Sequence, residues 1–130
     1  MIVIDASALL EALLGTPVGS IVSARLAENS NELHAPHLLD LEVTNALRRY
    51  ALNQTLPVDR CQQALADLSN FPLYRHPHEH LVARVWQLRD NLSAYDAAYV
   101  ALAEMLGASL VTHDQRIGGA TGHHARIELV

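Results

Sequence analysis

The chain has 130 residues, half of them hydrophobic and 18% charged, with a formal net charge of −5; this is typical of one compact domain and excludes a disordered chain. The negative charge argues against a protein that coats nucleic acid by neutralising its phosphates. A single cysteine excludes an internal disulfide, no apolar run is long enough to span a bilayer, and we expect a cytoplasmic protein without a secretory signal or a membrane partner.

Short apolar runs alternate with helical patterns along the chain. We predict strands at 2–5, 33–36, 71–76, 109–112 and 125–130. We predict helices at 7–14, 17–29, 38–54, 57–70, 77–90 and 93–106, with a polar turn at 113–122. Gly15 and Gly107 end two of these helices, and Pro17 begins another. Strands that alternate with helices predict one α/β sandwich over residues 1–130, with a mainly parallel sheet.

Two acids follow predicted strands. Asp5 ends the first strand, and Asp114 comes after the strand at 109–112 and the turn residue His113. Neighbouring parallel strands present their carboxyl ends at the same edge of a sheet, where ligands collect, so these two side chains can meet. Simpler interpretations stay open, because Asp is a favoured helix N-cap and commonly forms an Asx turn.

Two further acids occupy apolar stretches of helix. Glu42 shares its helical face with Asn45 and otherwise with apolar neighbours. Asp96 is the one charged residue in the segment 91–103, and a lone buried carboxylate is unfavourable unless something compensates it. Here too a structural interpretation stays open, because glutamate is a good helix former and the segment 93–96 matches a capping box.

Four carboxylates that converged without cations would repel one another strongly. A hard divalent ion such as Mg²⁺ or Mn²⁺ resolves that conflict, because it prefers oxygen ligands and keeps waters for a substrate phosphate. Two such ions, about 4 Å apart, can activate a water and stabilise the leaving oxygen in phosphodiester hydrolysis. No Ser or Cys nucleophile is then required. The predicted ligands are Asp5, Glu42, Asp96 and Asp114.

The four acids lie in the segments IVIDASALL, LLDLEVTNALRR, SAYDAAYVALAE and LVTHDQRI. In this order the segments resemble PIN-domain ribonucleases of the VapC toxin type, over essentially the whole chain. The resemblance implies a three-layer α/β/α sandwich and a metal-dependent endoribonuclease that cleaves RNA, such as tRNA or rRNA. It also implies the toxin of a type II toxin–antitoxin system, a homodimer that a VapB-type antitoxin blocks.

The resemblance assigns the four acids to Mg²⁺, with Mn²⁺ as an alternative. Ser7 and Thr112 match the small hydroxyls that support the acidic cluster. Asn45, one turn beyond Glu42, is expected to brace the site by hydrogen bonding. Some relatives carry a further acid shortly after the residue that corresponds to Asp114, and this chain does not, so the number of metal ions stays open.

Three arginines near these acids are candidate RNA phosphate contacts: Arg48, Arg49 and Arg116. Arginine binds phosphate through a bidentate fork. Their position rests only on proximity in the sequence, and solvent-facing arginines on a helix and a turn are the simpler interpretation.

Other classes of protein would place different demands on these acids. A PIN-like nuclease that acts on another RNA or on DNA would keep the same acids. A metal-binding signalling module would need paired acids near the first strand, where Asp5 stands alone, and a haloacid-dehalogenase-type phosphatase would need an Asp in place of Ser7. The histidines of RHPHEH, residues 75–80, do not share a helical face, and we interpret them as surface residues.

Overall fold

The computed structural model describes residues 1–28 and 32–130. One sheet of five strands has the order β3-β2-β1-β4-β5, and every neighbouring pair is parallel. The strands are β1 (Ile2–Ile4), β2 (Leu33–Pro36), β3 (Tyr74–His76), β4 (Ser109–Thr112) and β5 (Arg126–Leu129). The predicted parallel sheet is confirmed, and β1 lies at its centre.

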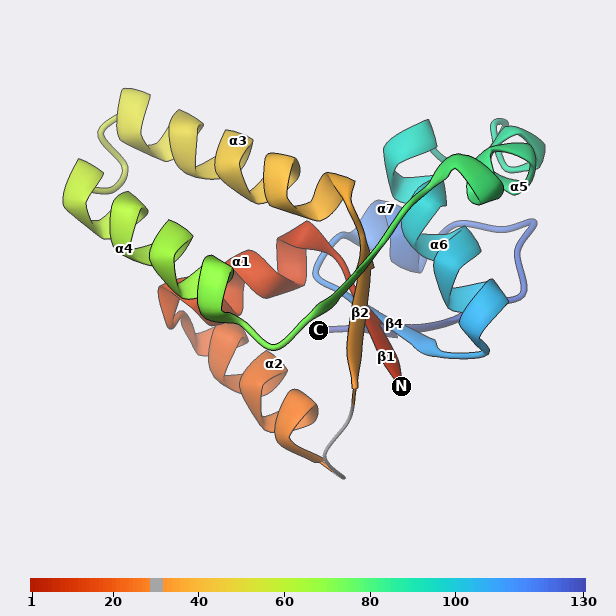
Figure 1. Ribbon diagram of the computed structural model, residues 1–130, viewed down its shortest axis with the longest axis horizontal. Coiled ribbons are helices and arrows are strands. Elements are labelled where there is room, and N and C mark those ends of the chain that lie inside the picture. The colour runs from red at the N-terminus through yellow and green to blue at the C-terminus, as the bar shows by residue number, and fades with distance from the viewer. Residues whose placement is uncertain (29–31) are drawn as a thin grey trace.

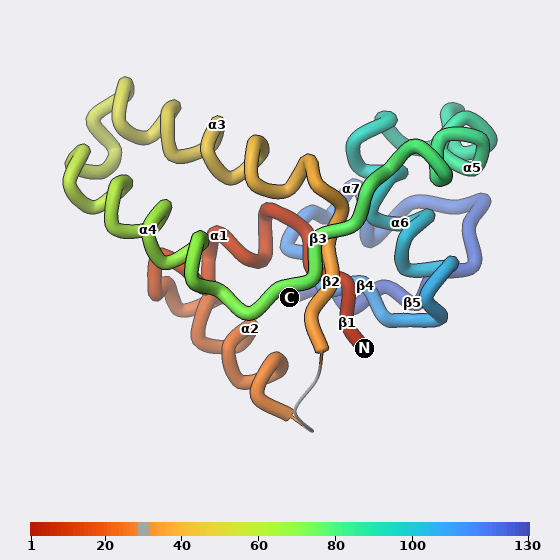
Figure 2. Tube along the Cα trace, viewed as in Figure 1, coloured from red at the N-terminus to blue at the C-terminus, as the bar shows by residue number. Residues whose placement is uncertain are grey.

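Helices lie on both sides of this sheet (Figure 1). One side carries α1 (Ala6–Leu14), α2 (Pro17–Ala27), α3 (Leu38–Leu52) and α4 (Val58–Asn70). The other side carries the 3₁₀ turn η2 (Glu79–Leu81), α5 (Val82–Gln87), α6 (Ala94–Leu106) and α7 (Gln115–Gly118). Figure 2 shows the same division along the Cα trace, with the strands between the two groups. The three-layer α/β/α sandwich is therefore confirmed.

Several predicted elements differ from the structure. The strand expected at 71–76 is shortened to β3 (Tyr74–His76), because Phe71 still caps α4. The helix expected at 77–90 is replaced by η2 and the short α5, because Pro77 keeps the preceding residue extended and helical structure begins only after His78. The turn expected at 113–122 contains α7, which is too short to give a periodic pattern. Asn29, where the second helix was expected to end, lies outside the described residues.

Close contact between α1 and α2 depends on Gly19. A Cβ atom at this position would lie 2.0 Å from the backbone oxygen of Glu11 in α1, so a larger residue would push the helices apart. Thr16 caps α2 by accepting a hydrogen bond from the Gly19 amide at 3.0 Å.

In the described part of the chain no single helix is long and apolar enough to cross a membrane. Taken together, α1 and α2 reach the required length and composition, but the two helices are bent by 106° relative to each other.

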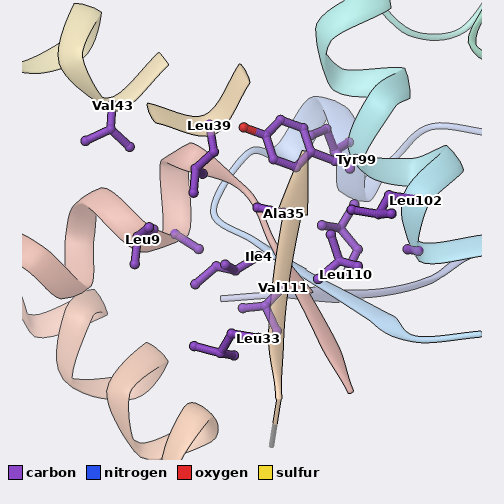
Figure 3. Close-up of a cluster of buried hydrophobic side chains, with 14 of the residues drawn as sticks. Ile4, Leu9, Leu33, Ala35, Leu39, Val43, Tyr99, Leu102, Leu110 and Val111 are labelled. Atoms are coloured by element: carbon purple, nitrogen blue, oxygen red, sulfur yellow. The ribbon is translucent and has the colours of Figure 1, made fainter. Parts of the chain in front are cut away.

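The hydrophobic core occupies both faces of the sheet. Figure 3 shows Leu9, Leu39 and Val43 on the side of α1 and α3, and Tyr99 and Leu102 on the side of α6. In α6 every residue from position 97 to position 103 is buried, as expected for this apolar helix. The first turns of α1 and α6 are thereby fixed against the carboxyl edge of the sheet.

Candidate active site

Asp5 lies directly after the central strand and is only 3% exposed. Its Oδ1 accepts hydrogen bonds from the Ser7 hydroxyl (2.7 Å) and the Ala8 amide (3.0 Å), and its Oδ2 accepts one from the Thr112 hydroxyl. Burial raises the pKa of the Asp5 carboxyl; the three hydrogen bonds lower it, and the charge of Asp114 raises it, with a net upward shift. Asp5 is thus the N-cap of α1 and also the best-supported acid of the cluster.

Asp114 stands at the end of the neighbouring strand β4 and begins α7. Its Oδ1 accepts a hydrogen bond from the Arg116 amide at 2.8 Å, and its Oδ2 accepts one from Nη2 of the same arginine at 2.7 Å. The Thr112 hydroxyl oxygen accepts from the Asp114 amide at 3.0 Å. The hydrogen bond from Arg116 holds the pKa of Asp114 below its usual range. One hydroxyl, that of Thr112, therefore connects both strand-end acids.

Glu42 lies half-buried in α3 and is held by α6. The Tyr99 hydroxyl donates a hydrogen bond of 2.6 Å to Oε1 of Glu42, and Figure 3 shows the Tyr99 ring reaching from α6 towards α3. Burial raises the pKa of Glu42; the Tyr99 hydrogen bond lowers it, and the charges of Asp96 and Asp5 raise it. The net shift of the pKa is upward, so the surroundings of Glu42 disfavour its charged form despite the hydrogen bond from Tyr99.

Asp96 occupies the first turn of α6. The Ser93 hydroxyl accepts a hydrogen bond from its amide at 3.1 Å, so this half of the predicted capping box is present. Burial raises the pKa of the Asp96 carboxyl and the charge of Asp114 adds to this, while the charge of Arg116 and the hydrogen bond with Ser93 lower it. Capping occupies the backbone amide and leaves the side chain to the cavity described next.

One cavity of about 410 Å³ receives all four acids. They come from four elements: the end of β1, the middle of α3, the start of α6 and the start of α7. Of the other residues predicted to belong to the site, Ser7, Asn45, Arg49 and Arg116 also line this cavity. Arg48 and Thr112 do not line the cavity, although the Thr112 hydroxyl donates a hydrogen bond to Asp5. The four acids that the sequence grouped are therefore neighbours in space.

The helix period explains which residues of α3 face the cavity. Glu42, Asn45 and Arg49 are spaced by three and four residues and lie on one face, whereas Arg48 is displaced from it by one residue. Asn45 lines the cavity, but its side chain makes no hydrogen bond with another described residue, so the expected brace is not seen. Tyr99 provides that brace for Glu42 instead.

Several residues that line the cavity were not predicted, among them Glu11, Tyr50 and Tyr99. Glu11 adds a fifth carboxylate, and it accepts a hydrogen bond from the Thr16 hydroxyl. A signal existed for two of them, since Glu11 follows Ser7 by four residues in α1 and Tyr99 follows Asp96 by three in α6. The histidines of segment 75–80 lie elsewhere; His76 is half-buried, with its Nε2 2.8 Å from Nδ1 of His34.

The donor atoms of the cavity fit a hard divalent ion. All of the acids offer oxygen, and three of them have a raised pKa to which the charge of another acid contributes, a repulsion that a cation would relieve. In the described part of the chain, no three acidic, histidine or cysteine side chains are grouped closely enough to hold a metal as they stand. Side-chain adjustment is therefore needed, and Asp114 is the acid engaged by a cationic side chain.

Comparison with known proteins defines the class of this fold and site. The family model of the PIN domain matches residues 2–121. The solved structure of PAE2754 from Pyrobaculum aerophilum matches with a TM-score of 0.71 and 28% identity, covering 97% of this chain and 81% of that one. VapBC2 from Rickettsia felis, bound to a DNA fragment from their promoter, has the same fold, with a TM-score of 0.68, 16% identity and coverage of 99% and 98%.

Sequence relatives narrow this class. Ribonuclease VapC12 of Mycobacterium tuberculosis is 40% identical over 130 residues, which is 100% of this chain and 99% of the relative. Ribonuclease VapC1 of the same species is 42% identical over 129 residues, or 98% and 96%. The chain therefore belongs to the PIN-domain family and, within it, to the VapC ribonucleases. This membership decides against the signalling module and the phosphatase.

Proposed function

We propose that this protein is a divalent-metal-dependent endoribonuclease and the toxin of a VapBC-type toxin–antitoxin system. One observation carries the proposal: four carboxylates from four separate elements line a single cavity in a chain 40% identical to a VapC ribonuclease. In this proposal the ligands of Mg²⁺ or Mn²⁺ are Asp5, Glu42, Asp96 and Asp114. These side chains would hold the ion, which when bound would supply an activated water for phosphodiester hydrolysis.

The chain's own residues orient the acids for this task. Ser7 and Thr112 fix both oxygens of Asp5, and Tyr99 fixes Glu42. Arg49 lines the same cavity, where its guanidinium would bind an RNA phosphate through two parallel hydrogen bonds. In a protein of net negative charge, such local cations and the metal replace a general basic surface.

The proposal includes its partners. Similar folds occur in VapBC2 from Rickettsia felis and in a toxin–antitoxin complex from Klebsiella pneumoniae, with a TM-score of 0.62 and 18% identity. We therefore include a VapB-type antitoxin that covers the cavity and excludes RNA, a homodimer, and a cytoplasmic location. Size-exclusion chromatography with light scattering tests the dimer directly.

Cleavage of total RNA with Mn²⁺, with Mg²⁺ and with EDTA tests the activity. Asp96→Asn is compared with Asp90→Asn, which changes an exposed acid shortly before α6, and circular dichroism confirms that both variants fold. We expect discrete metal-dependent fragments from the wild type and from Asp90→Asn, and none from Asp96→Asn. Equal cleavage by folded Asp96→Asn would contradict the four-acid site. A wild type that neither cleaves RNA nor arrests growth on expression would contradict the nuclease.

A further inference from the structure

Arg116 is held by one of the proposed metal ligands. Its Nη2 lies 2.7 Å from Oδ2 of Asp114, and its Nε lies 3.1 Å from Oδ1 and 3.3 Å from Oδ2. Both carboxylate oxygens are therefore engaged by the same guanidinium. The Arg116 charge also interacts with Asp96 across the cavity that both residues line. Arg116 thus places a positive charge beside two of the four acids.

The environment of this ion pair makes it easy to exchange. The Arg116 side chain is 81% exposed, whereas that of Asp114 is 19% exposed. An ion pair with one partner in water contributes little to stability and is screened by salt. The two residues are also only two positions apart, so breaking the contact requires no movement of the fold. A divalent ion carries more charge than a guanidinium and competes for the same oxygens.

The remaining donors of Arg116 suit a second anion. A guanidinium has five N–H groups. In Arg116 only Nε and Nη2 donate hydrogen bonds to described residues, both to Asp114. Arg116 lines the cavity from the first turn of α7. If its guanidinium separated from Asp114, the side chain would therefore still be attached beside the cavity. Phosphate and carboxylate have matching geometry for the arginine fork, so one can replace the other.

We propose that Arg116 is an exchangeable counter-ion: it neutralises Asp114 in the metal-free protein, releases it when a divalent cation binds, and then binds a phosphate of the RNA. This inference rests on the proposed metal-dependent nuclease. It makes Arg116 a positioning residue in one state and a substrate contact in the other. Removing its charge should therefore strengthen metal binding and weaken RNA binding, and a residue with a merely structural role would not give these opposite effects.

Calorimetric titration of the whole protein with Mn²⁺ tests the first half. Arg116→Gln should bind Mn²⁺ roughly 2- to 5-fold more tightly than the wild type, the range that an exposed ion pair is able to withhold. Arg116→Lys keeps the charge and should stay near the wild-type affinity. Arg126→Gln is the matched control, because Arg126 is an exposed arginine at the start of β5 and lies at the amino ends of the strands, away from the cavity. This variant should bind Mn²⁺ with the wild-type affinity.

Fluorescence anisotropy with a labelled 20-nucleotide oligouridylate, measured with Ca²⁺ in place of Mn²⁺, tests the second half. Arg116→Gln should bind this RNA several-fold more weakly, with a salt dependence reduced by about one phosphate contact. Arg126→Gln should bind as the wild type does.

Each outcome has one meaning. Unchanged or weaker Mn²⁺ binding by Arg116→Gln would overturn the counter-ion role, and unchanged RNA binding would overturn the phosphate contact. A wild type that binds no Mn²⁺ would instead overturn the proposed metal-dependent function, and with it the exchange.

Discussion

Acids outside the cavity and acids inside it are compensated in different ways. Outside, each of three acids is held by two hydrogen bonds from one arginine: Glu128 by Arg25, Asp40 by Arg75, and Glu104 by Arg84. These contacts hold the pKa of Glu104 and of Glu128 below its usual range. These pairs join α2 to β5, α3 to β3 and α5 to α6, and so contribute to the fold.

Inside the cavity only Asp114 has an arginine partner among the described residues. The pKa values of Asp5, Glu42 and Asp96 are raised, with burial as the largest cause. The chain therefore uses bidentate arginines where a charge must be neutralised for stability, and it leaves Asp5, Glu42 and Asp96, as well as Glu11, without one in the cavity. Free energy is lost by keeping those charges close together, and a bound cation would recover it.

The largest expected effect separates two Glu→Gln variants. Glu42→Gln should lower metal-dependent RNA cleavage by at least about 100-fold, because it removes a charged ligand from the cavity. Glu104→Gln, which changes an acid outside the cavity, should leave the cleavage rate per folded molecule within about 2-fold. Rates are measured with Mn²⁺ at equal concentrations of folded protein. Similar losses in both variants would break the distinction between the two groups of acids.

Tyr99→Phe should have the next largest effect. It deletes the hydroxyl that positions Glu42 and leaves the buried ring in place. Loss of such a supporting hydrogen bond lowers metal affinity or activity by about 10-fold in comparable sites. Mn²⁺ affinity is measured by calorimetry beside Tyr95→Phe, a change of an exposed tyrosine on the same helix. Equal affinities in the two variants would show that Glu42 does not need this bond.

Without metal, the same two variants should change the free energy of unfolding in opposite directions. In EDTA at neutral pH, Glu104→Gln should lower the free energy of unfolding by about 1 kcal/mol, since it removes the charge that accepts two hydrogen bonds from Arg84 and one from the His124 amide. Glu42→Gln should raise it by a smaller amount, because repulsion within the cavity falls. Urea unfolding measures both changes. A loss of stability in both variants would mean that the charge of Glu42 is compensated within the fold.

The smallest expected effect is the pH dependence of the stability difference between Glu42→Gln and Glu104→Gln. The raised pKa of Glu42 means that, above its ordinary value of about 4.3, the folded protein retains a proton that the unfolded chain has lost. Stability from this group therefore falls as pH rises through that window. The lowered pKa of Glu104 has the opposite sign: its stabilisation is present above the ordinary value and is lost as pH falls through the lowered one.

Unfolding in EDTA between about pH 4 and pH 7 measures this, with differences expected below about 1 kcal/mol. The advantage of Glu42→Gln over the wild type should grow with pH, and so should the deficit of Glu104→Gln. Parallel slopes in the same direction would contradict the opposite pKa shifts.

Most of the fold could be predicted because its signals are local. Gly107 at φ 63° ends α6 and the Ser93 hydroxyl caps it, as expected from residues that favour these positions. The failures are also local: α7 has four residues and α5 has six, both shorter than a periodic pattern can reveal. The parallel order of the strands followed from their alternation with helices.

The site was predictable only in part. Asp5 and Asp114 were predicted from their positions after strands, and Glu42 and Asp96 from their positions in apolar stretches of helix. Each of the four also had a structural interpretation, and only their combination and the family resemblance favoured a common site. Tyr99 lies one helical turn after Asp96 and could have been predicted from that spacing, but its hydrogen bond to Glu42 could not, because the two residues are 57 positions apart. The ion pair between Arg116 and Asp114 was not predicted, because proximity in the sequence indicates only that Arg116 lies near the acids and not which group it contacts.

The bond between Asp5 and Thr112 joins residues 107 positions apart. A ribosome makes β1 first, yet β4, which supplies Thr112 and the neighbouring edge of the cavity, emerges only after every helix from α1 to α6. The two strand-end acids therefore meet late in synthesis. A nascent chain that has not yet extended beyond β4 has no assembled acidic cluster, and under the proposed function it would be unable to cleave RNA near the ribosome that is making it.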